Sequence, residues 1–265
     1  EEIQRARIEY ENHMIIDSCT KAIEVGKVTG TVENPVLENA SADEIHKALD
    51  NTKGMLRITS IAKAWTYACM MLKTLRGYLV MENYDHLLDV TKDIKYDDLP
   101  KEVLPEVKLI EHLVRDYTIF TSLKDCILSG QIAGEVGRVN RNQIKYSALE
   151  SAVSSAIEES VVTRKTSTLI ACAKLLIKAR KTVKYSTVSE YETVVDCVMP
   201  DVENIFEFSG VILNEIDLAK RECLTNLVIV TMQKAVSHGQ IIVINEKPQT
   251  NSIEYAHLEE KILWA

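Results

Sequence analysis

The sequence predicts an all-α protein: a tandem helical repeat whose antiparallel helices form an elongated, solenoid-like stack, with short extended loops between units. Three observations predict this fold class. Turn-forming residues are few, with 9 Gly and 5 Pro among 265 residues. Apolar residues recur at helical spacing. Short motifs recur at offsets of 104 to 109 positions, and a fixed long period is the sequence signature of repeat architectures.

The motif Gly130-Gln131-Ile132 recurs 109 positions later as Gly239-Gln240-Ile241, and five more identities follow without a gap. An earlier copy lies 104 positions upstream. There, Gly26, Gly30, Val32 and Ala48 match Gly130, Gly134, Val136 and Ala152, and Leu72 and Arg76 match Leu176 and Arg180. We therefore expect Leu72 to superpose on Leu176, and Arg76 on Arg180.

These matches divide the chain into four parts. Residues 1–25 are the tail of a preceding repeat, 26–129 form the first full repeat, 130–238 form the second, and 239–265 begin a third. Each unit of about 105 residues should bury its flank on the next unit, as in other repeat proteins.

The expected helices have counterparts in both repeats. They are Asp43–Met55 and Ile144–Glu159, Ile58–Val80 and Thr166–Tyr185, a short helix at Tyr84 and at Tyr191, and Glu102–Ser129 and Asp201–His238. The apolar stripes follow helical spacing, as in Leu149, Val153, Ala156 and Ile157, and in Leu169, Ala173, Leu176, Ile177 and Val183. Prolines 100, 105 and 200 interrupt the chain before the last long helix of each repeat.

Each long helix should end at a glycine, Gly130 or Gly239, which adopts a left-handed cap easily. The segments that begin at Gly26, Gly130 and Gly239 are rich in alternating and β-branched residues. We expect them to be extended, as the only strands of the fold.

The overall charge argues against nucleic-acid binding, because the net charge is -8 and the pI about 5.4. The longest uncharged apolar run, Cys223–Gln233, is too short to span a bilayer. Six cysteines occur without a C-x-x-C pair, which favours buried, reduced thiols and a cytoplasmic location.

No catalytic motif is present, so we expect no enzyme, no cofactor and no metal site. The Gly134–Gly137 G-x-x-G segment is best explained as a turn between helices. The six histidines do not form a zinc-binding helix pattern, and the acidic residues Asp89, Asp93, Asp97 and Asp98 lack the calcium-loop order. An active site assembled from scattered side chains stays open, and a pocket shared by several perturbed titratable groups would favour it.

A basic stretch from Arg164 to Lys184 contains no acidic residue. Its candidate partner-binding residues are Arg164, Lys165, Lys174, Lys178, Lys181 and Lys184. Basic amphipathic helices dock onto acidic surfaces or into calmodulin-like grooves. The alternative is a core helix with a basic outer face, in which Ile170, Ile177 and Val183 are buried.

Arg76 and Arg180 follow apolar pairs at equivalent positions, and Asp89 and Asp196 also recur. We expect each arginine to form a structural ion pair with the aspartate of its own repeat. Trp65 and Trp264 are expected to be packing residues.

Three segments carry a family resemblance: Cys126-Ile127-Leu128-Ser129-Gly130, Gly134-Glu135-Val136 and Leu176-Ile177-Lys178-Ala179-Arg180. Their arrangement resembles tandem α-helical repeats of very large protist proteins. Such proteins are often cytoskeletal, ciliary or signalling scaffolds. The resemblance implies a structural segment, associated with cytoskeleton or cilium, whose partners are other proteins and neighbouring repeats of its own chain.

The expected function is therefore a non-enzymatic scaffold that mediates protein–protein contacts through helical repeats. The alternative is a binding module for an acidic or calmodulin-like partner through residues 164–184.

Overall fold

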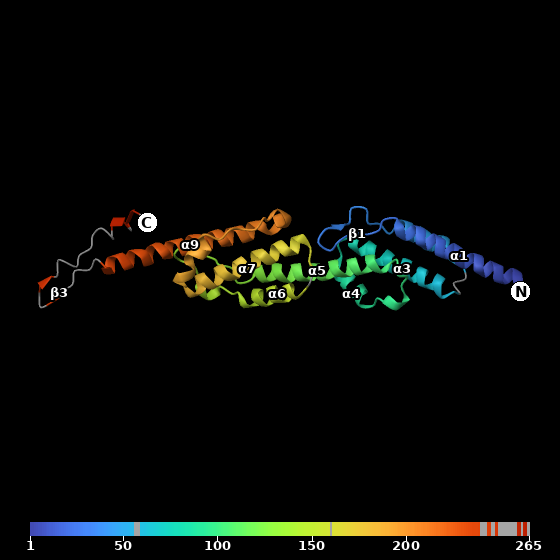
Figure 1. Cartoon of the computed structure of the whole chain (residues 1–265), viewed down its shortest axis with the longest axis horizontal. Coiled ribbons are helices and arrows are strands. Elements are labelled where there is room, and N and C mark those ends of the chain that lie inside the picture. Colours follow the sequence, from blue (N-terminus) through green and yellow to red (C-terminus); the bar gives the residue numbers. More distant parts are fainter. Residues whose placement is uncertain are drawn as a thin grey trace. The chain divides into compact units, whose positions relative to one another are not determined.

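The computed structural model is all-α: in the residues that it describes, nine α-helices carry nearly all of the regular structure (Figure 1). These residues are 1–55, 59–159 and 161–238, with 243–244, 247–248, 259–260 and 262–263. The chain divides into two compact units. Unit 1 comprises Glu1–Thr121 and Glu159–Ser167, and unit 2 comprises Ser122–Glu158 and Thr168–Ala265.

Unit 1 contains α1 (Glu2–Glu24), α2 (Asp43–Asn51), α3 (Ser60–Val80), α4 (Tyr84–Lys92), a 3₁₀ turn (Tyr96–Asp98) and most of α5 (Leu104–Leu128). Helices α1, α2 and α3 pack against one another, and α4 packs against α3. The core side chains Ile15, Ile45, Leu72, Leu75 and Ile110 are fully buried. The amphipathic pattern of the sequence therefore produces one continuous core in this unit.

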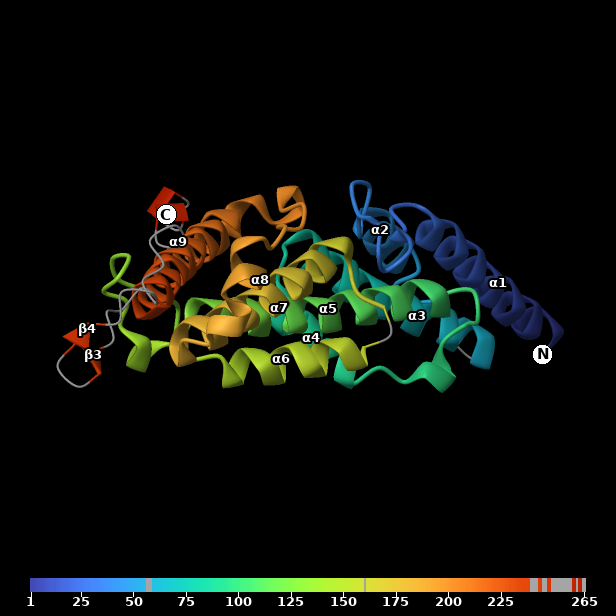
Figure 2. The same ribbon diagram turned by 60° about the vertical axis from the view of Figure 1, so that its left-hand side comes forward.

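Unit 2 contains the end of α5, α6 (Ser147–Glu158), most of α7 (Arg164–Tyr185), α8 (Tyr191–Val195) and α9 (Phe206–His238). Short 3₁₀ turns lie at Arg141–Gln143, Val188–Glu190 and Glu203–Ile205. Helix α7 lies between α6 and α9 in both ribbon views (Figures 1 and 2). Its buried residues Leu169, Cys172, Ala173 and Leu176 have no exposed surface.

The helix ends follow local chemistry. Thr59 caps α3, because its Oγ1 accepts a hydrogen bond from the Ala62 backbone N–H at 3.1 Å. Pro105 lies in the first turn of α5, where a missing N–H costs nothing. Gly130 has φ +65° after α5, which confirms the left-handed cap expected there. Gly239 lies outside the described residues.

Two expected features differ in the structure. Helix α2 ends at Asn51 rather than Met55: the Thr52 hydroxyl bonds back to the Ala48 carbonyl at 2.8 Å, and Gly54 has φ +88°. The buried apolar stripes of α6 and α7 are also narrower than predicted. Ile157 is 56% exposed and Ile177 is only partly buried, whereas Ile170 and Val183 are buried.

The extended segments agree only partly with expectation. After α1, β1 (Thr29–Gly30) pairs antiparallel with β2 (Pro35–Val36). After α5, no strand forms among the described residues, although the Asn140 N–H donates to the Ala133 carbonyl at 3.3 Å. The third segment lies mostly outside the described residues, except that β3 (Val243–Ile244) pairs with β4 (Lys247–Pro248).

Among the described residues, no helix is both long enough and apolar enough to cross a bilayer. None of the six cysteines, all of which are described, forms a disulfide, and Cys19, Cys69, Cys172 and Cys223 are buried.

Candidate functional site

Unit 1 contains a buried ion pair between Arg76 on α3 and Glu106 on α5. The guanidinium donates from Nε to Glu106 Oε1 at 2.7 Å and from Nη2 to Oε2 at 2.8 Å. Its remaining hydrogen bonds go to three backbone carbonyls, those of Ile23, Val25 and Ser41. The Val28 N–H donates to Glu106 Oε1 at 2.9 Å. We call this network the first arginine clasp.

Unit 2 contains a second arginine clasp between Arg180 on α7 and Glu215 on α9. Nε donates to Glu215 Oε1 at 2.7 Å, and Nη2 donates to Oε2 at 2.9 Å. The carbonyls that accept from this guanidinium are those of Cys126, Ile127, Ser129 and Lys145. The Ile132 N–H donates to Glu215 Oε1 at 2.9 Å. Each clasp thus ties the loop after one long helix to two other helices.

The two clasps match residue by residue. Arg180, Ile127, Ser129, Lys145 and Ile132 each lie 104 positions after their counterparts Arg76, Ile23, Val25, Ser41 and Val28. The glutamates differ in offset, since Glu215 lies 109 positions after Glu106. Side chains of both arginines are 0% exposed, and those of the glutamates are 0% and 3% exposed.

Burial makes these pairs sensitive to the loss of either member. A buried ion pair gains little net stability over an apolar pair, because both charges lose their hydration. Removal of one partner leaves an uncompensated buried charge and costs about 3–5 kcal/mol. Each clasp therefore adds little net stability over an apolar pair, whereas the loss of one member should be strongly destabilising.

A second matched feature lies at the start of α3 and α7. Asn12 Oδ1 accepts from the Thr59 N–H at 3.1 Å and from its hydroxyl at 3.0 Å. Asp116 accepts from the Thr163 N–H at 2.8 Å and from its hydroxyl at 2.7 Å. Asp116 and Thr163 again lie 104 positions after Asn12 and Thr59. The hydrogen-bond acceptor at the start of α3 is thus the amide oxygen of Asn12, and the acceptor at the start of α7 is the carboxylate of Asp116.

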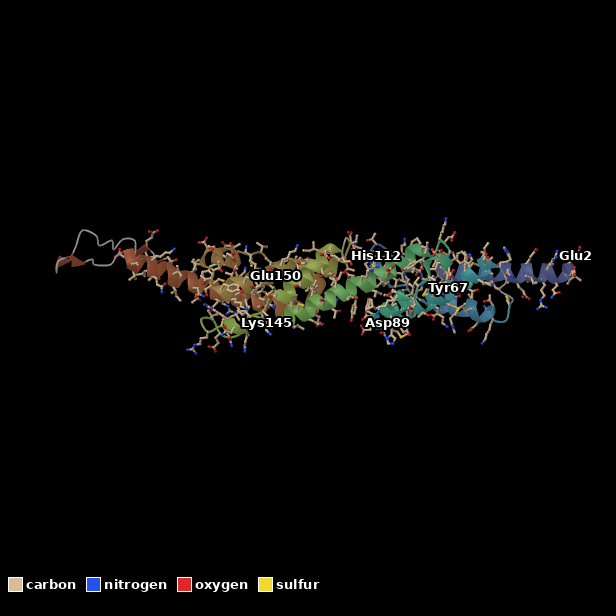
Figure 3. The ribbon with its side chains drawn as sticks, turned by 90° about the horizontal axis from the view of Figure 1, so that it is seen from below. Glu2, Tyr67, Asp89, His112, Lys145 and Glu150 are labelled. Atoms are coloured by element: carbon tan, nitrogen blue, oxygen red, sulfur yellow. The ribbon has the colours of Figure 1, made fainter. Side chains whose placement is uncertain are left out.

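The expected pairing of Arg76 with Asp89, and of Arg180 with Asp196, is wrong. Asp89 is exposed and pairs with Lys92 at 2.9 Å on the same helix. The Lys92 ammonium, through its hydrogen bond and its charge, lowers the pKa of Asp89. The structural role expected for the arginines is confirmed, but their partners are glutamates on the next long helix. Figure 3 labels Asp89 on α4.

The six basic residues predicted to bind a partner separate into two groups. Lys165, Lys181 and Lys184 interact within the protein. Lys165 lies over the Phe120 ring at 4.8 Å, Lys181 pairs with Glu150, and Lys184 donates to the Ile144 carbonyl at 2.8 Å. Arg164, Lys174 and Lys178 are exposed, and their side chains form no hydrogen bond or ion pair within the described part of the chain.

Three surface pockets are alternative candidate sites. The pocket at the start of α6 has a volume of about 260 Å³ and is lined by Lys145, Lys184, Tyr146 and Tyr185, among others. The hydrogen bond between the Tyr146 and Tyr185 hydroxyls raises the pKa of Tyr146. Figure 3 labels Lys145, which lines this pocket, and Glu150 on α6.

Two further pockets belong to unit 1. One, of about 400 Å³, contains the stacked rings of Tyr84 and Tyr117. Burial, and then the charge of Glu82, raise the pKa of Tyr84. The other, of about 750 Å³, contains Trp65, which packs against the core as expected. Trp264 lies outside the described residues.

The chemistry of these pockets is limited. No histidine lines any of the three. Within the described ranges, no three His, Cys, Asp or Glu side chains are placed to hold a metal ion. The buried arginines and glutamates of the two clasps are fully engaged in holding loops and helices together.

Comparisons with protein-family models, with curated proteins and with solved structures find no match for this chain.

Proposed function

We propose that the chain is a non-enzymatic scaffold segment built from tandem helical units of about 105 residues, which present extended surfaces to other proteins. The observation that carries the proposal is the pair of arginine clasps, in which five matched positions keep one offset of 104. Independent folds rarely place the same guanidinium against equivalent carbonyls and an equivalent N–H.

The arrangement of α5 supports the same proposal. Its first half supplies Glu106 to the first clasp, and its last turn supplies the Cys126 and Ile127 carbonyls to the second. A helix used in this way belongs to two successive units. In an array, each unit would then be stabilised by its neighbours. We extend the proposal to a solenoid-like stack and to a cytoskeletal or ciliary setting, as the sequence resemblance implies.

Single-molecule pulling of the full chain tests this proposal. The two compact units comprise 130 and 135 residues. They should unfold in two successive steps of nearly equal length, each releasing roughly 430–490 Å of chain at 3.3–3.6 Å per residue. A single step that releases the whole chain, or two steps of clearly unequal length, would count against the tandem arrangement.

A second function, binding of an acidic protein surface, is favoured by Lys174 and Lys178. Both are exposed, and neither is engaged within the described residues. Docking into a calmodulin-like groove would require the apolar side of α7, yet Leu176 is 0% exposed and Val183 is 2% exposed. The charged side alone is available, so we favour an acidic surface over a groove.

Charge reversal tests this second function. The Lys174→Glu, Lys178→Glu variant should lose salt-sensitive binding to a glutamate-rich peptide, because the attraction is Coulombic and screened by salt. The matched control is Lys101→Glu, Lys108→Glu, which makes the same charge change at two exposed lysines of unit 1. Equal weakening by both variants would show that only net charge matters.

A further inference from the structure

The first half of α1 carries the same side-chain pattern as a buried part of α9. Glu2, Ile3, Ala6 and Glu9 are each repeated 213 positions later, as Glu215, Ile216, Ala219 and Glu222. These four identities fall within eight consecutive positions. Their spacing of i, i+1, i+4 and i+7 places them on one face of a helix. We call the face formed by Glu2, Ile3, Ala6, Glu9 and Tyr10 the α1 face.

The matching face of α9 is buried and fully engaged. Glu215 belongs to the second arginine clasp. Glu222 accepts from the Gly137 N–H at 2.6 Å and lies 3.6 Å from Arg141. Ile216 is 2% exposed, and Ala219 and Cys223 are 0% exposed. In unit 2, therefore, the side chains of this pattern contact Arg180 on α7 and the loop that follows α5.

The α1 face is uncovered. Ile3 is 87% exposed and Tyr10 is 65% exposed. Glu2 and Glu9 are exposed and form no ion pair within the described residues. The first turns of α1 project beyond the other helices of unit 1 in both ribbon views, and Figure 3 labels Glu2 at that end (Figures 1, 2 and 3).

The corresponding face of α5 shows that the position is normally covered. Glu106 and Val107 lie 104 positions after Glu2 and Ile3, and Val114 lies 104 positions after Tyr10. Val107 is 0% exposed and Val114 is 1% exposed. Helices α9 and α5 thus bury the face that is equivalent to the α1 face, whereas α1 leaves it exposed.

We propose that the α1 face is a docking surface for one further helical unit of the same kind, joined in helical register ahead of Glu2. The arginine of that unit at the position of Arg180 would bind the Glu2 carboxylate through both oxygens, as it binds Glu215. Its loop at the position of Gly137 and Arg141 would contact Glu9. This inference rests on the proposed tandem arrangement and names the partner of one specific face.

A fusion of the full chain to an extra unit tests the proposal. Residues 104–214 are joined directly to residues 2–265, so that Glu2 follows Asn214 and takes the position of Glu215. A matched control inserts two alanines at the junction. The insertion rotates the α1 face by about 200° relative to the added unit. A reference fusion replaces residues 2–10 with residues 215–223 at the same junction.

The readout is the melting temperature of each protein with and without Glu2→Gln. In the in-register fusion, the substitution should lower the melting temperature by about 5–15 °C, because it leaves a buried arginine uncompensated. In the unfused chain and in the two-alanine control, Glu2 is exposed, and the shift should be about 1 °C or less.

The outcomes separate the two proposals. If the reference fusion folds but Glu2→Gln has no effect in the in-register fusion, the α1 face is not a docking surface, and the tandem arrangement stands. If the added unit fails to fold even in the reference fusion, the tandem arrangement itself is wrong, and this inference is wrong with it.

Discussion

Arg180 occupies the same environment as Arg76, 104 positions earlier in the chain: each guanidinium is fully buried and grips both oxygens of a glutamate 2.7–2.9 Å away. Each also binds the carbonyls at the end of a long helix and in the loop after it. A buried charge is tolerated here because every donor has an acceptor. The same solution used twice is the main physical observation behind the proposed tandem arrangement.

The glycine at the end of α5 should be far less tolerant of substitution than a glycine in the following loop. Gly130 and Gly137 both have positive φ, at +65° and +79°. A Cβ at Gly130 would collide with Lys145, whereas a Cβ at Gly137 would meet nothing within 4 Å. Gly137→Ala should therefore cost about 1–2 kcal/mol from backbone strain alone. Gly130→Ala should cost clearly more in urea unfolding, and equal costs would contradict the packing at Lys145.

Two adjacent positions on α7 should also differ in how much stability is lost when each is replaced by alanine. Leu176 is 0% exposed, whereas Ile177 is only partly buried. Leu176→Ala should destabilise the chain by about 2–5 kcal/mol, because it leaves a cavity in the core of unit 2. Ile177→Ala should cost about 1 kcal/mol, since solvent replaces part of the lost contact. Thermal melts of the two variants side by side measure the difference, and a larger loss at Ile177 would place the wrong side of α7 in the core.

Thiol reactivity should follow burial. Burial raises the pKa of Cys172 to about 11 and that of Cys223 to about 12. The reactive thiolate is therefore scarce at these two sites at pH 8. Cys126 and Cys197 are only partly buried. Alkylation of the native protein at pH 8, followed by mass spectrometry, should modify Cys126 and Cys197 first. Modification of Cys172 at the same rate would contradict its burial.

The raised thiol pKa values also predict a pH dependence of stability. An unfolded cysteine ionises around its ordinary pKa of 9.0, whereas folded Cys172 keeps its proton to about pH 11. The unfolded state alone gains from ionisation in this range, so the contribution of Cys172 to stability is fully present below about pH 8 and is lost between pH 9 and 11. The loss over that window should be smaller in Cys172→Ala than in the unsubstituted chain. Urea unfolding at pH 8 and at pH 10 measures this loss of unfolding free energy for both proteins. The same loss in both would contradict the raised pKa of Cys172.

The helices were predictable because local signals set them. Apolar spacing, Pro105 and the positive-φ glycines Gly26 and Gly130 define elements that begin and end within a few residues of expectation. The narrower apolar stripe of α7 was not predictable, because the exposure of Ile177 depends on which neighbours cover it. A sequence pattern shows which residues share one side of a helix. It does not show how many of these residues a neighbouring helix covers.

The partners of the arginines were missed for a physical reason. Glu106 lies 30 positions after Arg76, and the matching interval in unit 2 is 35 positions, from Arg180 to Glu215. The five additional residues move the glutamates from the 104-residue offset of the arginines to an offset of 109. The exposed Asp89 and Asp196, at an offset of 107, match the arginine offset more nearly. The signal that could have identified the glutamates is the pair Glu106-Val107 and Glu215-Ile216. These dipeptides share the 109-residue offset of the glycine motifs.

The basic side of α7 was predictable as a charged surface, but the interactions of its individual lysines were not. The sequence identifies Lys174, Lys178 and Lys181 as one charged group. Only the folded chain shows that Lys181 pairs with Glu150, while Lys174 and Lys178 remain unengaged within the described residues. The difference arises because Glu150 on α6 lies within ion-pair distance of Lys181.

A matched pair of double-mutant cycles tests the central claim, that the two clasps are the same structural device, most directly. The first cycle combines Arg76→Met with Glu106→Gln, and the second combines Arg180→Met with Glu215→Gln, each measured by urea unfolding. Every single substitution should cost about 3–5 kcal/mol, and each double variant should cost clearly less than the sum of its singles. The two coupling energies should agree within about 1 kcal/mol, since both pairs are buried and doubly hydrogen-bonded. A large coupling in one unit and none in the other would contradict the equivalence of Arg76 and Arg180.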